Sequence, residues 1–489
     1  MNRVKTPQSR CRAGVARRDI TPPVGIYHRM WGAALHDQAT GVHRPLEATL
    51  LLLEPEDPAT GEALIVVSLD HCILDTVELC FIRESMATMT KVPYQNIQVT
   101  LSHTHGSGWM SRTRSDLPGG EMIGPYLDLL APTLYVLAVE ARLRAESASI
   151  VYGFGRCNLA AHRDFHDVER GIYACGFNPD GPADDTLLVA RIQNTAGDSI
   201  ATLVNYACHP TTLAWENTLI SPDWVGAMKE VIENEEGVPC LFLQGASGDL
   251  GPREGFVGDT AVADRNGRQV GFAALSTLAT LPPAGTEFRY AGPVISGATI
   301  ATWKHQPLSE SDLRAQTTWR WEQLTVQLPY RADLPTIEQT TAEREHWIAE
   351  ESLARESGDE NQLRICRAQI EQRTRQLTRL NALVPGREYP LTLRIGIFGD
   401  AIWLFVPGEL YQVFQTTLRD RFAPRPVVVA TLTNDWQPGY IPPASTYGHG
   451  IYQEIIAATA PGCLESLIDE ITSRLESMIT NPSLRSRSC

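Results

Sequence analysis

Apolar residues follow two periods along the chain, and each period predicts one kind of element. Apolar runs of strand length, alternating or continuous and bounded by turn residues, are typical of strands. They predict strands at 14–21, 46–54, 63–69, 96–101, 149–154, 186–193, 199–206, 239–244, 391–398, 401–406 and 427–433. Apolar residues at helical spacing predict helices at 76–89, 126–146, 224–234, 265–278, 410–422 and 464–478. The mixture predicts an α/β (mixed α+β) fold with a large, mostly β-sheet core flanked by helices.

Two segments depart from this pattern. Residues 334–383 are dense in Glu, Arg and Gln and have a helical period broken at Gly358, which predicts two polar helices packed as an αα-hairpin. We interpret them as an insertion in a single catalytic domain that spans residues 13–480. Residues 1–12 are polar and basic without an apolar stretch, so we expect a disordered leader and no secretory signal.

Composition excludes several classes of partner. Hydrophobic residues make up 43% of the 489 positions and charged residues 20%, as in ordinary globular proteins. A net charge of −15 disfavours nucleic acid and anionic membrane surfaces. No run approaches the roughly 20 apolar residues of a membrane span, so no stable membrane association is expected. A small-molecule substrate is the partner class that remains, and the oligomeric state stays open.

The ten cysteines stand singly, without a Cys-x-x-Cys pair. Scattered single cysteines in a chain of this size are typical of reduced, mostly buried thiols. They favour a cytoplasmic location.

The strand at 96–101 runs into two histidines and a glycine turn, Ser102-His-Thr-His-Gly106. Because side chains alternate along a strand, His103 and His105 are expected to point the same way at the strand's end. Ligands bind at strand ends in open α/β sheets, and two imidazoles suit a divalent metal.

Three further residues stand where a predicted strand runs into a turn: His209, Glu409 and Tyr440. Each alone also fits a structural role, as a turn histidine, a carboxylate at a helix start or a packed aromatic residue. Together with His103 they offer nitrogen and oxygen ligands of the kind that zinc takes in proteins.

Other residues near these motifs have two readings each. Asp223 and Asp249 either orient the histidines or cap a helix and a turn. Trp109, Trp215 and Trp224 either wall a pocket or pack in the core.

Eight segments, in order, resemble the catalytic domain of the neutral (non-lysosomal) ceramidases. They are Asp19-Ile-Thr-Pro-Pro23, Gly41-Val-His-Arg-Pro-Leu46, Ser102-His-Thr-His-Gly106, Asn205-Tyr-Ala-Cys-His-Pro210, Ile220-Ser-Pro-Asp-Trp224, Gln244-Gly-Ala-Ser-Gly-Asp249, Val406-Pro-Gly-Glu409 and Gly439-Tyr-Ile-Pro442. The resemblance implies one catalytic zinc per chain with four ligands, His103, His209, Glu409 and Tyr440. It also implies that His105 hydrogen-bonds the substrate or the transition state, and that Arg163 binds the substrate's polar end.

The chain departs from that family at three points. Gly251 stands where ceramidases have a serine long proposed as the nucleophile, so a serine mechanism is not expected. Arg44 stands where bacterial relatives often have an acidic residue. The C-terminal immunoglobulin-like domain and the export signal of ceramidases are expected to be absent, which argues against ceramide as the substrate.

The sequence therefore predicts a zinc-dependent hydrolase that cleaves an amide (C–N acyl) bond in a small polar substrate by metal-activated water, and not a true ceramidase. His105, Tyr440 and Arg163 are the expected catalytic residues. Two alternatives stay open. One is an ester or lactone hydrolase with the same zinc site, and the other is a catalytically silent protein that binds a ligand in the metal pocket.

Overall fold

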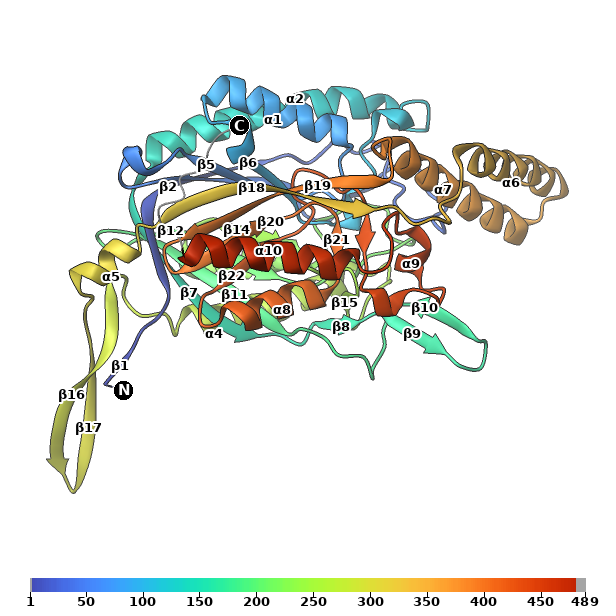
Figure 1. Cartoon of the computed structure of the whole chain (residues 1–489). Coiled ribbons are helices and arrows are strands. Elements are labelled where there is room, and N and C mark those ends of the chain that lie inside the picture. Colours follow the sequence, from blue (N-terminus) through green and yellow to red (C-terminus); the bar gives the residue numbers. More distant parts are fainter. Residues whose placement is uncertain (1, 481–489) are drawn as a thin grey trace.

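The computed structural model describes residues 2–480, and its centre is an eight-stranded sheet (Figure 1). The strand order is β14 (Cys240–Gln244), β12 (Ser199–Tyr206), β11 (Thr186–Asn194), β7 (Glu146–Arg156), β2 (Gln8–Asp19), β4 (Glu47–Glu54), β5 (Leu64–Leu69) and β6 (Ile97–Leu101). Neighbours are antiparallel except at the two ends, where β12 pairs in parallel with β14 and β5 with β6. The predicted strands of this sheet are all present.

A four-stranded sheet packs on the first. Its order is β18 (Trp319–Pro329), β19 (Glu388–Phe398), β20 (Ala401–Phe405) and β22 (Val427–Ala430). Alternation along β20 explains the packing: Trp403 and Phe405 face the eight-stranded sheet, and Ile402 and Leu404 face helices on the other side. Strand residues of both sheets thus form one shared apolar layer.

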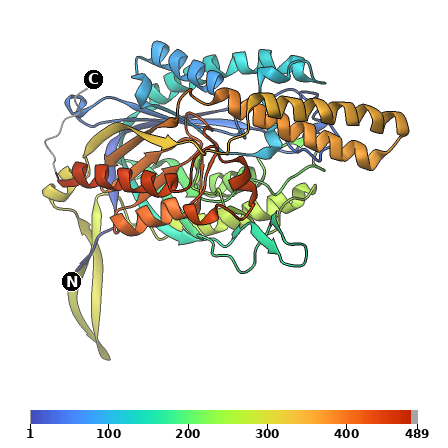
Figure 2. The ribbon, with the colours of Figure 1, turned by 45° about the vertical axis from the view of Figure 1, so that its right-hand side comes forward.

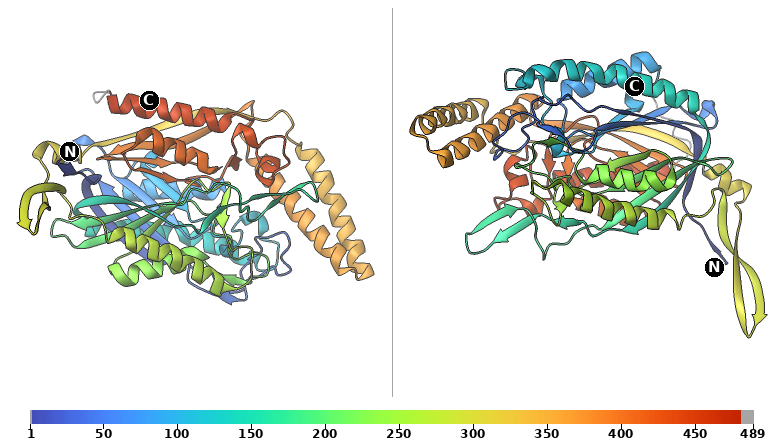
Figure 3. Two further views of the ribbon diagram at one scale, coloured as in Figure 1. Left: turned by 90° about the horizontal axis from the view of Figure 1, so that it is seen from below. Right: turned by 180° about the vertical axis from the view of Figure 1, so that it is seen from behind.

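Helices cover the two outer faces. On the eight-stranded sheet lie α1 (Thr76–Thr90), α2 (Ile123–Arg144), α3 (Trp224–Glu236) and α4 (Thr260–Leu278), and on the smaller sheet lie α8 (Gln412–Phe422) and α10 (Cys463–Thr480). Figure 3 (left) shows the resulting order of layers, helix, sheet, sheet, helix. The mixed α+β fold with a sheet core flanked by helices is confirmed.

Two hairpins project from these layers (Figures 1 and 2). One is β16 (Thr286–Ser296) and β17 (Ala298–Pro307); the other is α6 (Ile337–Ser357) and α7 (Glu360–Ala382). The two polar helices expected at 334–383 are therefore present. The short elements are β1 (Arg3–Val4), β3 (Gly41–Val42), β8 (Ala160–His162), β9 (Asp164–Asp167), β10 (Ile172–Cys175), β13 (Leu219–Ile220), β15 (Leu250–Pro252), β21 (Glu409–Leu410), β23 (Tyr440–Ile441), α5 (Glu310–Ala315) and α9 (Tyr452–Ile456).

The prediction of a disordered leader at residues 1–12 is wrong for residues 2–12, where the structure has strands. β1 pairs with β16, and β2 already begins at Gln8. Polar residues there are buried because they find partners: the Gln8 amide nitrogen donates to the Thr286 carbonyl at 3.0 Å, and the Ser9 hydroxyl donates to the Phe398 carbonyl at 2.5 Å. Composition alone does not show such pairing.

Within residues 2–480 one helix, Gly120–Arg144, is long and apolar enough to cross a membrane by length and composition. The sequence reading had expected no such segment. In the fold, Leu127, Leu130 and Leu134 of this helix are buried in the core with residues of β2 and β4. Packing on the sheet accounts for that apolar face.

Candidate metal centre

Three strand ends from the two sheets meet at one place. Ser68 of β5 donates its hydroxyl to the Phe242 carbonyl of β14 at 2.7 Å, so the two ends of the eight-stranded order lie together. Thr100 of β6 also bridges to Thr433, just beyond β22 of the smaller sheet. The segments that leave β6, β12 and β20 therefore converge.

His103 leaves β6 in a left-handed conformation, with φ of 67°. Its Nδ1 donates to the Cys72 carbonyl at 2.8 Å, because a carbonyl only accepts. This bond fixes the tautomer and leaves Nε2 facing Glu409 Oε2 at 3.2 Å. Nε2 is therefore the nitrogen that the side chain presents to the site.

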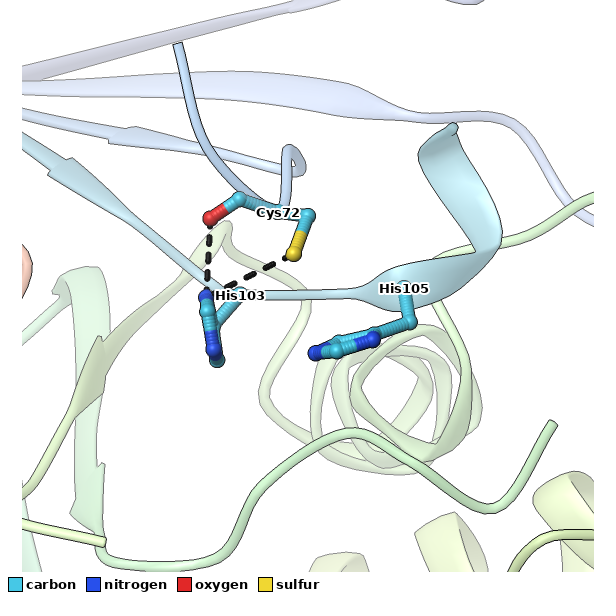
Figure 4. Close-up of side chains that lie close together, drawn as sticks. All are labelled: Cys72, His103 and His105. Carbon is cyan, nitrogen blue, oxygen red and sulfur yellow. Dashed lines mark hydrogen bonds between the residues drawn. The ribbon is translucent and has the colours of Figure 1, made fainter. Parts of the chain in front are cut away.

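His103 and His105 do not owe their proximity to strand alternation. β6 ends at Leu101, and His105 opens a short 3-10 turn, His105–Ser107. Nevertheless the two rings lie 5.1 Å apart between centroids, and Figure 4 shows them side by side. The predicted pair is present, but the turn and the unusual backbone of His103 create it.

His209 enters the site directly after β12. Its Nδ1 donates to the Ser247 carbonyl at 2.7 Å, and its Nε2 lies 3.1 Å from the same Oε2 of Glu409. Both histidines thus have the same arrangement, with a backbone carbonyl behind the ring and one carboxylate oxygen before it.

Glu409 and Tyr440 lie on two short strands that pair with each other, and this pairing positions both side chains. β21 pairs in parallel with β23, with Glu409 opposite Tyr440. The Tyr440 hydroxyl lies 3.3 Å from His209 Nε2 and accepts a 2.8 Å bond from Arg163 Nη2. All four residues that the resemblance implies as ligands therefore lie together.

Burial and mutual charge decide the protonation states. Burial and the nearby Arg163 lower the pKa of His209 to about 3. Burial opposes ionisation of Glu409, but the two imidazoles outweigh it and hold the pKa of this carboxyl well below its usual range. Burial likewise opposes charge on His103, but the neighbouring Cys72 and Glu409 raise its pKa. A carboxylate between two imidazoles is a donor set that suits a divalent cation.

The potential ligand atoms of His103, His209 and Glu409 all lie within 4.8 Å of one another. A second such group joins Cys72 to His103 and His105 (Figure 4). Sequence reasoning missed Cys72, which follows β5. The parallel pairing of β5 with β6 brings it beside His103, since parallel strands end at the same edge.

Both ring nitrogens of His105 are buried and have no hydrogen-bond partner within residues 2–480. Trp31, which the sequence analysis did not single out, packs on this ring with centroids 4.9 Å apart. Burial and the charges of His103 and His209 lower the pKa of His105 well below its ordinary value. A neutral imidazole with free nitrogens is suited to exchange a proton with a bound molecule.

Arg163 is buried and lies beside the Tyr440 hydroxyl. Its Nη2 also donates to the Gly248 carbonyl at 2.6 Å, whereas its Nε has no partner in the described chain. Gly251 is close by: a Cβ there would lie 4.0 Å from Arg163 Cδ, an ordinary contact. The position expected for a nucleophile is therefore beside the site, without a side chain.

The two aspartates do not orient the metal-facing histidines. Asp223 accepts from the backbone nitrogens of Leu213 and Trp224, and so caps α3. Asp249 accepts from the backbone and the side chain of Gln412, both at 2.7 Å. The backbone carbonyls of Cys72 and Ser247 orient these histidines instead. Because every residue has a backbone carbonyl, no sequence motif marks this role.

The three tryptophans differ. Trp224 is fully buried against Tyr206 and Phe242, and is a core residue. Trp109 is buried beside Trp436. Trp215 is the one near the site, 6.3 Å from Trp31 between centroids.

Comparisons with known proteins bear on the fold. No protein-family model and no curated protein matches this chain. Among solved structures, the chain is similar to the neutral ceramidase from Pseudomonas aeruginosa, with a TM-score of 0.63 at 15% identity over 99% of this chain and 76% of that one. It is also similar to a ceramidase complexed with C2, with a TM-score of 0.65 at 14% identity over 99% and 77% of the two chains. The chain thus has the ceramidase fold, as the sequence motifs predicted.

Proposed function

We propose that this protein is a zinc-dependent hydrolase that cleaves an amide bond in a small polar substrate. The convergence of His103 Nε2 and His209 Nε2 on one oxygen of Glu409, at 3.2 and 3.1 Å, carries the proposal. Ceramidases that share the fold support an amide as the bond cleaved.

The donor set fits one zinc ion per chain. His103, His209 and Glu409 would hold it, with Tyr440 as a fourth and weaker ligand. When bound, such an ion polarises a carbonyl and lowers the pKa of water towards about 7.

The chain's own residues supply the remaining chemistry. His105, kept neutral by burial, accepts a proton from the attacking water and returns it to the leaving amine. The Tyr440 hydroxyl, held by Arg163, donates to the oxygen on which negative charge develops. No serine nucleophile is needed, which agrees with Gly251.

Ester and lactone hydrolysis would use the same groups, because the carbonyl and the attacking water are common to all three reactions. The comparisons give no support to excluding ceramide, so a short-chain ceramide belongs among the test substrates. A silent binding protein is the alternative from another class; the two free nitrogens of His105 favour an enzyme.

Metal analysis of the purified protein tests the site, and we expect about one zinc per chain. His103→Ala and His209→Ala should lose it, whereas His346→Ala, in the projecting α6, should keep it. A panel of amides, esters, lactones and ceramide with and without chelator separates the activities. A protein without stoichiometric metal, whose His103→Ala variant binds as much metal as the wild type, would overturn the proposal.

A further inference from the structure

The α6–α7 hairpin is fastened to the body of the molecule beside the metal centre. Glu371 of α7 accepts two bonds from Arg114, at 2.9 and 3.1 Å. One face of α7 also packs closely on the segment between β2 and β3, since a Cβ on Gly32 would lie 3.4 Å from the Ala368 backbone. Residues 375 and 379 follow Ala368 on this face, because positions three and four apart in a helix are neighbours.

Arg375 is fully engaged within the protein. Its Nε donates to Glu371 at 2.8 Å, its Nη2 donates to the Met30 carbonyl, and its guanidinium lies 4.9 Å from the ring centroid of Trp109. Its role is to dock the helix.

Arg379, one turn further, differs. Its Cδ lies beside Gly439, next to Tyr440, where a Cβ on the glycine would be 3.9 Å away. Tyr452, Arg375, Glu409 and Tyr440 are the groups whose charge acts on its guanidinium. Within residues 2–480 it forms no ion pair and no hydrogen bond, although α7 has other arginines that do.

The site therefore has an excess of positive charge. Arg163 is buried with no carboxylate within 4.0 Å in the described chain, and Glu409 is the one carboxylate among the donors. A divalent ion more than neutralises Glu409, which leaves Arg379 without a counter-charge, whereas Arg163 keeps the negative charge of the neighbouring Asp164. Arg379 is half-buried, and a charge partly withdrawn from water without a partner is costly, so such a pocket is complementary to an anion.

We infer that Arg379 binds an anionic group, a carboxylate or a phosphate, on the molecule that the metal centre acts on. This inference rests on the proposed function and narrows its substrate class to anionic acyl compounds. The charge of the whole chain, −15, repels such a molecule, so selection for it must come from local cations. Within residues 2–480, Arg379 lies beside the metal centre without a protein partner and is free for this role.

Matched substrates test the inference in the zinc-loaded protein. One pair is an N-acyl amino acid and its carboxamide; the other is an N-acyl phosphoethanolamine and the N-acyl ethanolamine. We expect wild type to prefer the charged member of one pair. In Arg379→Gln the ratio of kcat/KM for charged over neutral substrate should fall about 10- to 100-fold, as for loss of a charge-assisted hydrogen bond, and Arg379→Lys should restore part of it. The pair that responds identifies carboxylate or phosphate.

Arg364→Gln is the matched control. Arg364 is exposed on the same helix, 15 residues and about 22 Å before Arg379 by the helical rise, so the same charge is removed far from the metal. Its ratio should equal that of wild type. If Arg379→Gln lowers charged and neutral turnover equally, the inference is overturned and the proposed function stands.

A binding measurement separates failure of the inference from failure of the proposed function. If wild type cleaves none of the four compounds, turnover cannot be compared, and their affinities for zinc-loaded wild type and Arg379→Gln are measured by calorimetry. About tenfold weaker binding of a charged compound to the variant still supports the anion site. Equal binding overturns it. The zinc content of each variant, measured alongside, shows that the metal centre is intact.

Discussion

The metal-facing imidazoles are oriented by main-chain atoms. The carbonyls of Cys72 and Ser247 each accept from an Nδ1, so the tautomer of both histidines is fixed by where two turns run and not by which side chains those turns have. Glu409 and Tyr440 then close the site from the other sheet. Among these four residues, Tyr440 is the one whose chemistry fits two roles, a metal ligand and a hydrogen-bond donor to the substrate.

Tyr440→Phe should keep about one zinc per chain, because His103, His209 and Glu409 remain. Its kcat should fall about 10²- to 10³-fold, the typical loss for one donor to a developing oxyanion. Metal analysis and steady-state kinetics at saturating zinc check both parts. A variant with wild-type turnover would remove the Tyr440 hydroxyl from the mechanism, and loss of zinc would make it an essential ligand.

The residues of the site divide by whether a local pattern marks them. His103, His105, His209 and Glu409 stand in motifs at predicted strand ends, and the sequence was sufficient to single them out. Cys72, Trp31 and Arg379 have no such motif. They reach the site through strand pairing, a loop contact and helix docking, which are long-range events that no window of sequence contains.

At the scale of elements, docking of α7 depends on one buried carboxylate. Glu371 lies between Arg114 and Arg375, with its side chain 7% exposed. Burial opposes its ionisation, but the two arginines outweigh burial and lower its pKa to about 2.

The pKa of Glu371 makes stability depend on pH. Its folded-state pKa lies below the ordinary value of 4.5, so its contribution is present above about pH 5 and is lost as pH falls towards 2. The shift corresponds to roughly 3 kcal/mol. Glu371→Gln should therefore be less stable than wild type at pH 7, and the difference should shrink at pH 3. Urea unfolding across this range measures it, with Glu356→Gln, at an exposed position of α6, as the control. A gap that stays constant with pH would contradict the assignment.

The strands that the sequence analysis did not predict, β16, β17 and β18, show which strands hydrophobic periodicity can detect. β18 has a period of two at each end, but Trp319 and Trp321 are buried on one face and Val326 and Leu328 on the other, so the phase changes within the strand. β16 is different, since nearly all of its residues are half-buried or exposed. A hairpin with water on both faces has no apolar side, so no pattern of burial predicts it. The helices of 334–383 were predicted for the opposite reason, a clear period in a polar sequence.

At the scale of the molecule, a buried ion pair joins the helical layer to the large sheet. Lys229 of α3 donates to both oxygens of Asp70, at 3.0 and 2.8 Å, and the two side chains are 2% and 1% exposed. Asp70 directly follows β5, close to the strand ends that form the metal centre.

Asp70→Asn should lower the free energy of unfolding by about 3–5 kcal/mol, because within residues 2–480 it leaves the buried ammonium with Glu47, 3.7 Å away, as its remaining carboxylate within 4.0 Å. Lys229→Met in the same chain should recover most of the loss, since no charge then remains unpaired. Glu310→Gln, which breaks the exposed pair with Arg314, should change stability by less than about 1 kcal/mol. Urea unfolding of the four proteins decides the matter, and a double variant as unstable as Asp70→Asn would contradict it.

The metal centre also has a consequence for the whole molecule, because its donors come from both sheets. His103 and His209 follow strands of the eight-stranded sheet, whereas Glu409 follows a strand of the smaller one. An ion bound there links the two sheets, and it binds the folded chain but not the unfolded chain. At a free zinc concentration 100 times the Kd, such binding contributes about 2.7 kcal/mol. Since the unfolding entropy of a chain of this size is about 1 kcal/mol per degree, chelation should lower Tm by about 3 °C. Scanning calorimetry of wild type and of His103→Ala, with and without chelator, measures this shift. The variant should melt near the temperature of the chelated wild type and show no response to chelator, whereas an equal response in both proteins would place the stabilising metal elsewhere.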